Sequence, residues 1–211
     1  MYTGHEEKKK VDKNKYLLMK TDIIIAGVGG QGILSIAACI GMAALENSMH
    51  IKQSEVHGMS QRGGAVQSHL RISDREIFSD LIPLGKADLI ISVEPMESLR
   101  YLPWIAKDGW VVSNTTPVKN IKDYPDTEEI IKSIKLLENH VIVDADKIAR
   151  EIGSPIYSNM VVLGAAARFI NLKHENIESG IRAIFARKGS EITARNLEAF
   201  NAGWQLSANI K

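Results

Sequence analysis

The sequence predicts a three-layer α/β/α domain in which helices cover both faces of a mainly parallel β-sheet. Short apolar runs at 22–26, 88–93 and 141–143 have the length and composition of strands that are buried on both faces. Each run is followed by a segment with helical spacing of apolar residues, and strands that alternate with helices pair in parallel. Residues 65–72 instead alternate apolar and polar positions, which predicts a small antiparallel insertion.

The other elements are expected from local patterns along the chain. A turn at 73–75 is expected to lead residues 76–79 back as a hairpin partner of 65–72. We expect Thr127 to cap one helix and Gly153 to end another. The further expected strands span 51–55 and 110–113, and the expected helices span 33–47, 95–101, 126–137, 145–152, 159–170, 174–186 and 191–207.

The length of the chain, 211 residues, suits one domain with a substantial core. We expect this domain to span residues 21–211. Residues 1–20 are rich in lysine and show no amphipathic period, which predicts a flexible, solvated leader.

Composition excludes several classes of protein. A net charge of +1 argues against a protein that binds the nucleic-acid backbone, so no nucleic-acid partner is expected. No apolar run reaches the length of a transmembrane helix, so no membrane partner is expected either. The N-terminus also lacks the apolar region of a secretory signal, and we therefore expect a cytoplasmic location.

Cys39 is the only cysteine of the chain, which rules out a disulfide framework and a cysteine-ligated iron–sulfur cluster. Its alanine and isoleucine neighbours predict a buried, small apolar side chain rather than a nucleophile. His57 has no second histidine or cysteine at ligand spacing, so no metal site is predicted. No arrangement of serine, histidine and aspartate is evident from spacing, and no catalytic residue is predicted on this chain.

A glycine-rich loop follows the first apolar run, and helical spacing begins directly after it. Gly27, Gly29 and Gly32 fit the pattern G-x-G-x-x-G, with Gly30 and Gln31 between them. A strand, a glycine turn and a helix N-terminus in this order present backbone amides to an anion in Rossmann-like folds. The loop therefore predicts a dinucleotide or phosphate site; the alternative is close packing of helix and strand without a ligand.

A second candidate segment lies at the end of the strand predicted at 51–55. Glu55 follows the glycines by roughly 20 residues, where an acidic residue binds the ribose of NAD in dinucleotide-binding folds. The loop after Glu55 is too rich in glycine and polar residues to form a regular element. Its candidate binding residues are His57, Gln61, Arg62, Gly63 and Gly64.

Glu94, after the strand predicted at 88–93, is the last candidate binding residue. In an open α/β sheet ligands bind beyond the carboxyl ends of the strands, so Glu94, the glycine loop and the loop after Glu55 are expected to converge on one crevice. The guanidinium of Arg62 suits a carboxylate or phosphate. Alternatively, Arg62 pairs with Glu55, and Glu94 is a helix N-terminal charge favoured by the helix dipole.

Four segments resemble the gamma-type module of 2-oxoacid:ferredoxin oxidoreductases, and within that family the beta subunits of the indolepyruvate enzymes most of all. The resemblance covers about residues 20–205. It is carried by GVGGQG at 27–32, SEVHGMSQRGG at 54–64, LIPLGKADLIISVEP at 81–95 and SNMVVLGA at 158–165, with Lys188, Glu191, Asn196, Phe200 and Gly203 in the last helix.

The resemblance implies a subunit rather than a free-standing enzyme. The family decarboxylates a 2-oxoacid oxidatively with coenzyme A and yields an acyl-CoA, carbon dioxide and reduced ferredoxin. This chain has neither cluster cysteines nor a G-D-G thiamine diphosphate motif. Thiamine diphosphate, Mg²⁺ and [4Fe-4S] clusters are therefore expected on a larger partner subunit, and no cofactor on this chain alone. Coenzyme A is the expected co-substrate, an arylpyruvate such as indolepyruvate the expected substrate, and ferredoxin the electron acceptor of the complex.

Two other functions remain open from the sequence. An independent NAD-binding dehydrogenase would use Gly27, Gly29, Gly32 and Glu55. A purely structural assembly subunit would make no contact with a ligand. If the chain is instead a subunit of an oxidoreductase, the glycine-loop amides and Arg62 are expected to face an anionic group near the partner's active site.

Overall fold

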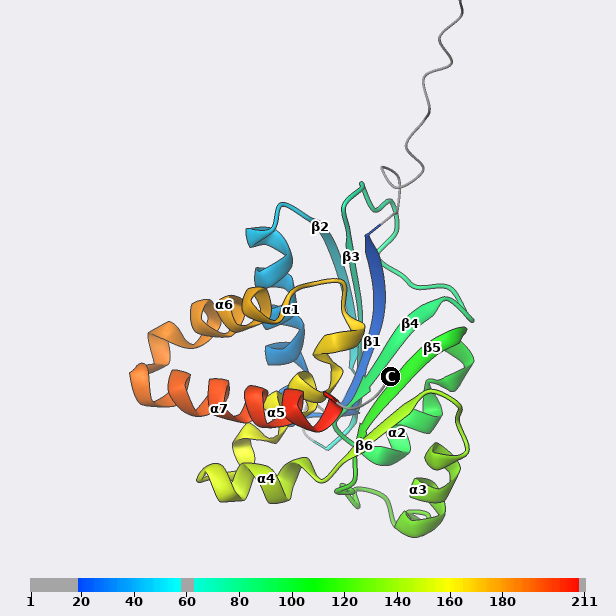
Figure 1. The fold of residues 1–211 in the computed structure, drawn as a ribbon. Helices are drawn as coiled ribbons and strands as arrows, with labels where there is room; N and C mark the ends of the chain where they lie inside the picture. The colour runs from blue at the N-terminus through cyan, green and yellow to red at the C-terminus, as the bar shows by residue number, and fades with distance from the viewer. Residues whose placement is uncertain (1–18, 58–62, 209–211) are drawn as a thin grey trace, which may run out of the picture.

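The computed structural model describes residues 19–57 and 63–208, and it has the predicted three-layer architecture (Figure 1). The expected leader therefore lies outside the described residues except for its last two. Six strands form one sheet in the order β2-β3-β1-β4-β5-β6. The strands are β1 (Lys20–Val28), β2 (His50–His57), β3 (Ala65–Ser73), β4 (Ala87–Ser92), β5 (Ile105–Asn114) and β6 (His140–Val143).

The sheet is parallel from β1 through β4 and β5 to β6, whereas β3 pairs antiparallel with both β1 and β2. The predicted antiparallel insertion is thus confirmed. It lies inside the sheet, between β1 and the strand that follows the first helix. This position matters for the site, because β3 separates β2 from the glycine loop by one strand.

Helices cover both faces of the sheet, as predicted (Figure 1). Side chains of β1 alternate between two apolar layers: Ile23 and Ile25 face the larger helical layer, and Ile24 and Ala26 face the smaller one. The larger layer contains α1 (Ile33–Glu46), α4 (Ala145–Ile152), α5 (Ser158–Ala166), α6 (His174–Phe185) and α7 (Ser190–Ser207), and the smaller layer contains α2 (Pro95–Arg100) and α3 (Thr127–Lys135). None of the described helices combines the length and apolar character that crossing a bilayer requires.

Two local predictions were wrong. Residues 76–79 form no strand. A side chain of β3, rather than a backbone ladder, holds the end of this segment and the residues after it, since Arg71 donates to the carbonyl oxygens of Ser79 and Leu81. The hairpin partner of β3 is β2. The cap of α3 is Asp126 rather than Thr127, since the Asp126 carboxylate accepts from the amides of Glu128 and Glu129.

Helices α5 and α7 approach closely because glycines stand at their crossing. A Cβ on Gly164 would lie 1.9 Å from the carbonyl oxygen of Phe200, and a Cβ on Gly203 would lie 2.0 Å from that of Val161. Neither position has room for a side chain. This packing brings the start of α7 next to the starts of α5 and α1, where the candidate site lies.

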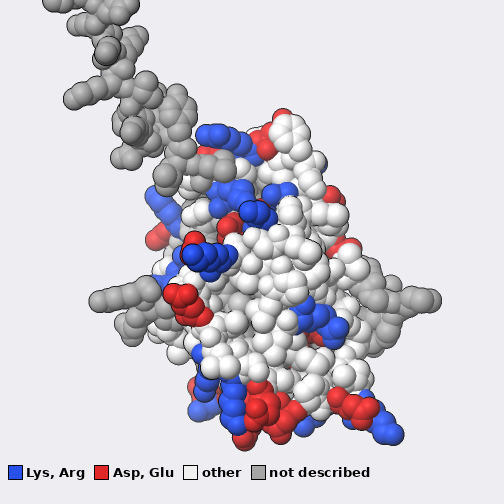
Figure 2. Space-filling view, turned by 90° about the vertical axis from the view of Figure 1, so that its right-hand side faces the viewer, with Lys and Arg blue, Asp and Glu red and all other residues white. Residues whose placement is uncertain are grey.

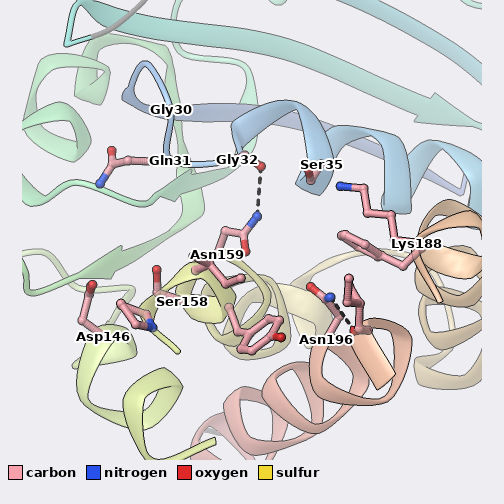
Figure 3. A pocket seen from close by; sticks show the side chains of 14 residues that line it. Gly30, Gln31, Gly32, Ser35, Asp146, Ser158, Asn159, Lys188 and Asn196 are labelled. Carbon is pink, nitrogen blue, oxygen red and sulfur yellow. Dashed lines mark hydrogen bonds between the residues drawn. The ribbon is translucent and has the colours of Figure 1, made fainter. Parts of the chain in front are cut away.

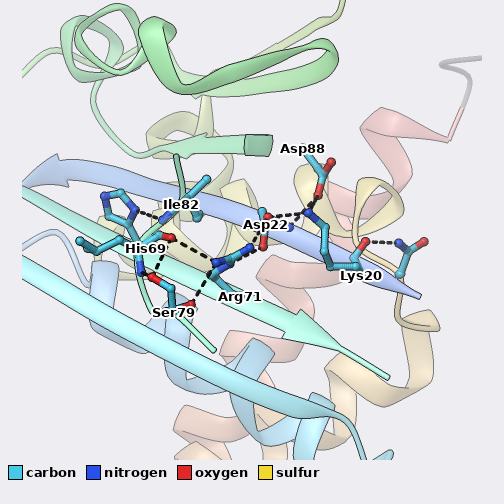
Figure 4. A network of polar contacts seen from close by, with 9 residues as sticks. Lys20, Asp22, His69, Arg71, Ser79, Ile82 and Asp88 are labelled. Atoms are coloured by element: carbon cyan, nitrogen blue, oxygen red, sulfur yellow. Dashed lines mark hydrogen bonds and ion pairs between the residues drawn. The ribbon is translucent and has the colours of Figure 1, made fainter. Parts of the chain in front are cut away.

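A buried ion-pair network lies at the sheet end opposite the glycine loop (Figure 4). Asp22, with 1% of its surface exposed, binds Arg71 Nε over 2.8 Å and Lys20 Nζ over 2.6 Å. Its backbone amide donates to Asp88 over 2.7 Å. Because Arg71 also binds the 79–81 backbone, this network joins β1, β3 and β4 to the segment between β3 and β4.

We predict that Asp22→Ala lowers the free energy of unfolding by about 3 kcal/mol, because it leaves the largely buried guanidinium of Arg71 without a carboxylate partner. Urea denaturation of the full chain measures this loss. Glu198→Ala, which removes an exposed pair with Arg195, is the control and is expected to cost about 0.5 kcal/mol. Equal losses in the two variants would contradict the assigned role of Asp22.

Candidate functional site

The glycine loop between β1 and α1 has little space for side chains. A Cβ on Gly27 would lie 2.4 Å from Val93, and a Cβ on Gly32 would lie 2.3 Å from the amide nitrogen of Asn159. Gly30 and Gly32 also adopt the left-handed conformation, with φ of 102° and 79°, which glycine tolerates best. The loop conformation therefore depends on these glycines.

Gln31 binds this chain rather than facing outward. Its Oε1 accepts from the amide of Val28 over 2.7 Å, and its Nε2 donates to the carbonyl oxygen of Val93 over 3.1 Å. The side chain thus bridges the carboxyl ends of β1 and β4. Gln31 was predicted to bind a ligand. In the structure its amide group instead holds the conformation of the loop through these two hydrogen bonds.

The N-terminus of α1 opens from this loop without a side-chain cap. The amides of Gly30, Ile33 and Leu34 donate no hydrogen bond within the described part of the chain, whereas those of Ser35 and Ile36 donate to the carbonyl oxygen of Gly32. Free amides and the helix dipole make such a helix start attractive to an anion.

A cleft of about 510 Å³ borders one side of the loop (Figure 3). The residues that line it come from the glycine loop, from the starts of α1, α4, α5 and α7, from the end of α6, and from the 3₁₀ turns before α5 and α7. They are Gly30, Gln31, Gly32, Ser35, Asp146, Pro155, Ile156, Tyr157, Ser158, Asn159, Phe185, Lys188, Ile192 and Asn196.

A second hollow of about 460 Å³ borders the other side of the loop, and Glu55 lines it together with Gly29, Gly30, Leu34 and other residues. Glu55 faces Ser68 of β3, which in turn faces Ile25 of β1. Two strand spacings, about 10 Å, therefore separate Glu55 from β1. In dinucleotide sites the acidic residue ends the strand next to the glycine strand. The insertion of β3 thus weighs against a ribose contact of that kind.

Gly63 and Gly64, just before β3, are hydrogen-bonded to the glycine loop. The amide of Gly29 donates to the carbonyl oxygen of Gly64 over 2.9 Å, and the amide of Gly63 donates back to Gly29 over 3.5 Å. Gly63 and Gly64 are thereby brought against the predicted site. Gln61 and Arg62 lie outside the described residues, and of His57 the structure describes the backbone alone.

Glu94 is fully buried, and its carboxylate caps the N-terminus of α2. The structure therefore supports the interpretation of Glu94 as a helix N-terminal charge over that of a ligand contact. Its carboxylate accepts from the amide of Glu97 over 2.9 Å, from the amide of Val118 over 3.3 Å and from the hydroxyl of Tyr124. Burial, followed by this bond to Glu94, raises the pKa of Tyr124 and keeps the phenol protonated as the donor.

Asn159 and Lys188 line the cleft and were not predicted as site residues. The amide nitrogen of Asn159 donates to Gly32 over 3.2 Å, across 127 residues of sequence. Local patterns carry no signal for such a contact. Both residues stand in the segments that carry the family resemblance, which is the one sequence signal that could have identified them.

The metal and cluster chemistry that the resemblance implies does not fit the side chains of this chain. Cys39 is fully buried, and desolvation raises its pKa to about 12, so it is a poor thiolate ligand. A [4Fe-4S] cluster needs about four such ligands. Among the described residues, no three histidine, cysteine, aspartate or glutamate side chains are grouped as a metal site requires.

Comparison with known proteins places the chain among subunits of oxidoreductases. The family model described as pyruvate ferredoxin/flavodoxin oxidoreductase matches residues 22–206. The chain is 37% identical to the indolepyruvate oxidoreductase subunit IorB of Pyrococcus horikoshii, over 86% of this chain and 93% of that protein. It is 25% identical to the 2-oxoglutarate synthase subunit KorC of Archaeoglobus fulgidus, over 90% of each.

Solved structures share the fold at lower identity. The gamma subunit of a keto/oxoacid ferredoxin oxidoreductase from Geobacter sulfurreducens gives a TM-score of 0.66 at 21% identity, over 89% of this chain and 98% of that one. The 2-oxoglutarate:ferredoxin oxidoreductase of Magnetococcus marinus, solved with 2-oxoglutarate, coenzyme A and succinyl-CoA, gives 0.71 at 22% identity. That match covers 92% of this chain and 32% of the Magnetococcus chain. The family match over nearly the whole sequence, together with the identity to the Pyrococcus subunit, shows that this chain belongs to the pyruvate ferredoxin/flavodoxin oxidoreductase family.

Proposed function

We propose that this chain is the cluster-free small subunit of an indolepyruvate-type 2-oxoacid:ferredoxin oxidoreductase. The complex would convert an arylpyruvate, coenzyme A and oxidised ferredoxin into an acyl-CoA, carbon dioxide and reduced ferredoxin. The observation that carries this proposal is the identity of 35–37% to four archaeal indolepyruvate oxidoreductase subunits. Identity to the 2-oxoglutarate synthase subunits is 25–29%, which supports the arylpyruvate over 2-oxoglutarate.

The side-chain chemistry supports a division of labour between subunits. Bound thiamine diphosphate stabilises the carbanion that decarboxylation leaves, and iron–sulfur clusters carry the electrons to ferredoxin. Because Cys39 is buried and has no cysteine partner, we place these groups and Mg²⁺ on a larger subunit. The role of this chain is then to bind and orient an anionic group through the glycine-loop amides and Arg62.

An exposed apolar segment supports assembly with such a subunit. Phe78, Leu81 and Leu84, between β3 and β4, expose 88%, 54% and 64% of their surfaces. The charged side chains leave a broad uncharged zone on the face that includes this segment (Figure 2). Exposed apolar surface of this kind marks protein interfaces. Arg71 and His69 bind the segment's backbone, so its shape is set before any partner arrives.

Phe78→Asp with Leu84→Asp is predicted to reduce co-purification with the larger subunit at least about tenfold, since two charges would be buried at the contact. Leu45→Asp, at an equally exposed leucine at the end of α1, is the matched control and should assemble normally. Unimpaired assembly of the double variant would show that this surface does not contact the larger subunit.

The isolated chain is predicted to show no turnover and to bind no NADH, because the cofactors would belong to its partner. Calorimetry with NADH, and ferredoxin reduction with indolepyruvate and coenzyme A before and after addition of the larger subunit, measure this. Binding of NADH in the hollow beside Glu55 would favour the alternative, an independent dehydrogenase. Activity that appears only in the complex is the expected result.

Arg62→Ala in the assembled complex is predicted to raise the Michaelis constant for coenzyme A or for the oxoacid about tenfold, because a charge-assisted hydrogen bond to an anion is lost. Steady-state kinetics with each substrate varied separately measure this. Arg75→Ala removes an exposed arginine from the turn after β3 and should change neither constant. If Arg62→Ala also changes neither, the proposed contact does not exist.

A further inference from the structure

Ile82 anchors the exposed segment between β3 and β4 to the sheet. Its side chain is 2% exposed and packs in the smaller apolar layer, whereas Leu81 and Leu84 on either side of it are exposed. Its backbone amide donates to Nδ1 of His69 in β3 over 3.0 Å (Figure 4). The position of the two leucines therefore depends in part on whether His69 can accept this bond.

The ring of His69 is enclosed and accepts this bond only when it is neutral. It is 4% exposed, and Trp104 stands edge-on to it with the ring centres 6.2 Å apart. Across from it on the neighbouring strands lie Ile24 of β1 and Ser54 of β2. An imidazole accepts only through a nitrogen that carries no proton. A second proton would make both ring nitrogens donors and leave the buried amide of Ile82 without its acceptor.

Two charged side chains act on the ring, and their effects are opposite. Burial is the largest influence and lowers the pKa of His69 from its ordinary value of 6.5, because it disfavours the charged form. Asp80 in the same segment raises this pKa, and Arg71, two residues further along the same face of β3, lowers it. Asp22 and Lys52 lie across from Arg71 on the neighbouring strands. The ring is therefore neutral at about pH 7, as its hydrogen bond requires.

The lowered pKa links the segment to pH. The unfolded chain takes up the proton at a higher pH than the folded chain does. The stability that this contact contributes is therefore complete above about pH 6.5 and is lost as the pH falls through the pKa of folded His69. Arg71 keeps its bonds to Ser79 and Leu81, because a guanidinium does not titrate in this range. Acidification is therefore expected to loosen the segment at Ile82 rather than to unfold the chain.

We propose that His69 makes the apolar surface formed by Phe78, Leu81 and Leu84 sensitive to pH. Neutral His69 holds the amide of Ile82 and keeps this surface in shape for a protein partner, and protonated His69 releases it. Binding a released segment must also supply the cost of ordering it, so affinity falls. The effect on assembly rests on the proposed function, whereas the contact itself is a property of this chain alone.

An NMR titration of the full chain from about pH 8 to about pH 4.5 tests the contact without a partner. The ring of His69 should titrate below 6.5, and the amide shift of Ile82 should follow with the same midpoint. Exchange of this amide with solvent, corrected for its intrinsic pH dependence, should be at least about tenfold faster in the protonated form. Titration of the exposed His50 at the start of β2 should leave the Ile82 amide unchanged.

Three results of this titration would overturn the proposal. The ring of His69 could titrate at or above 6.5, it could stay neutral down to the lowest pH, or the Ile82 amide could fail to follow it. Each would show that protonation of His69 does not control the anchor of the segment.

His69→Asn is the matched variant for assembly. The Oδ1 of asparagine can take the place of Nδ1 and accept from the Ile82 amide, but it does not titrate. Binding of the unmodified chain to the larger subunit should weaken about tenfold as the pH falls through the midpoint of His69, and binding of the variant less than about twofold. His50→Asn is the control and should keep the full pH dependence.

The outcomes for the two proposals can be told apart. Equal loss of affinity in His69→Asn and in the unmodified chain would show that His69 does not control assembly. Absence of assembly at every pH would overturn the proposed function, and the titration of the isolated chain would still decide the role of His69.

Discussion

The absence of side chains at Gly27 and Gly32 is the constraint on which the crevice depends. At one end of the loop Val93 of the β4–α2 connection occupies the place of a Cβ, and at the other end Asn159 of α5 does. Any other residue would push these elements apart and move the start of α1 with them. Gln31 then fixes the same loop from within by bridging β1 and β4. These contacts fix where α1 begins, between the cleft on one side of the loop and the hollow on the other.

The layers and most elements could be predicted because they follow from local periodicity, whereas the strand order could not. The alternation in β3 predicted an antiparallel strand correctly, but its place between β1 and β2 is set by contacts distant in sequence. The expected hairpin at 76–79 failed for a similar reason. The backbone at Ser79 and Leu81 is held by the side chain of Arg71 from β3. The apolar pattern of residues 76–79 alone cannot predict a contact with a side chain of another strand.

The candidate site was predicted in part, and the misses have a common cause. Sequence pattern located polar residues at the carboxyl ends of strands, but it does not show which way their polar atoms turn. Gln31 and Glu94 stand where a ligand contact was expected, and both are bound by this chain's own backbone. Asn159 and Lys188 approach the loop only after α5 and α7 pack through Gly164 and Gly203. Helix crossing, not sequence proximity, brings them to the cleft.

The inserted strand gives the two sides of the glycine loop different chemistry. In a dinucleotide fold the strand next to the glycine strand carries the acid that binds ribose. Here β3 takes that place, and Glu55 stands one strand further out. On the other side, uncapped helix starts and Lys188 surround a larger opening. The glycine pattern thus stands beside an inserted strand, and strand order rather than the pattern itself sets its surroundings.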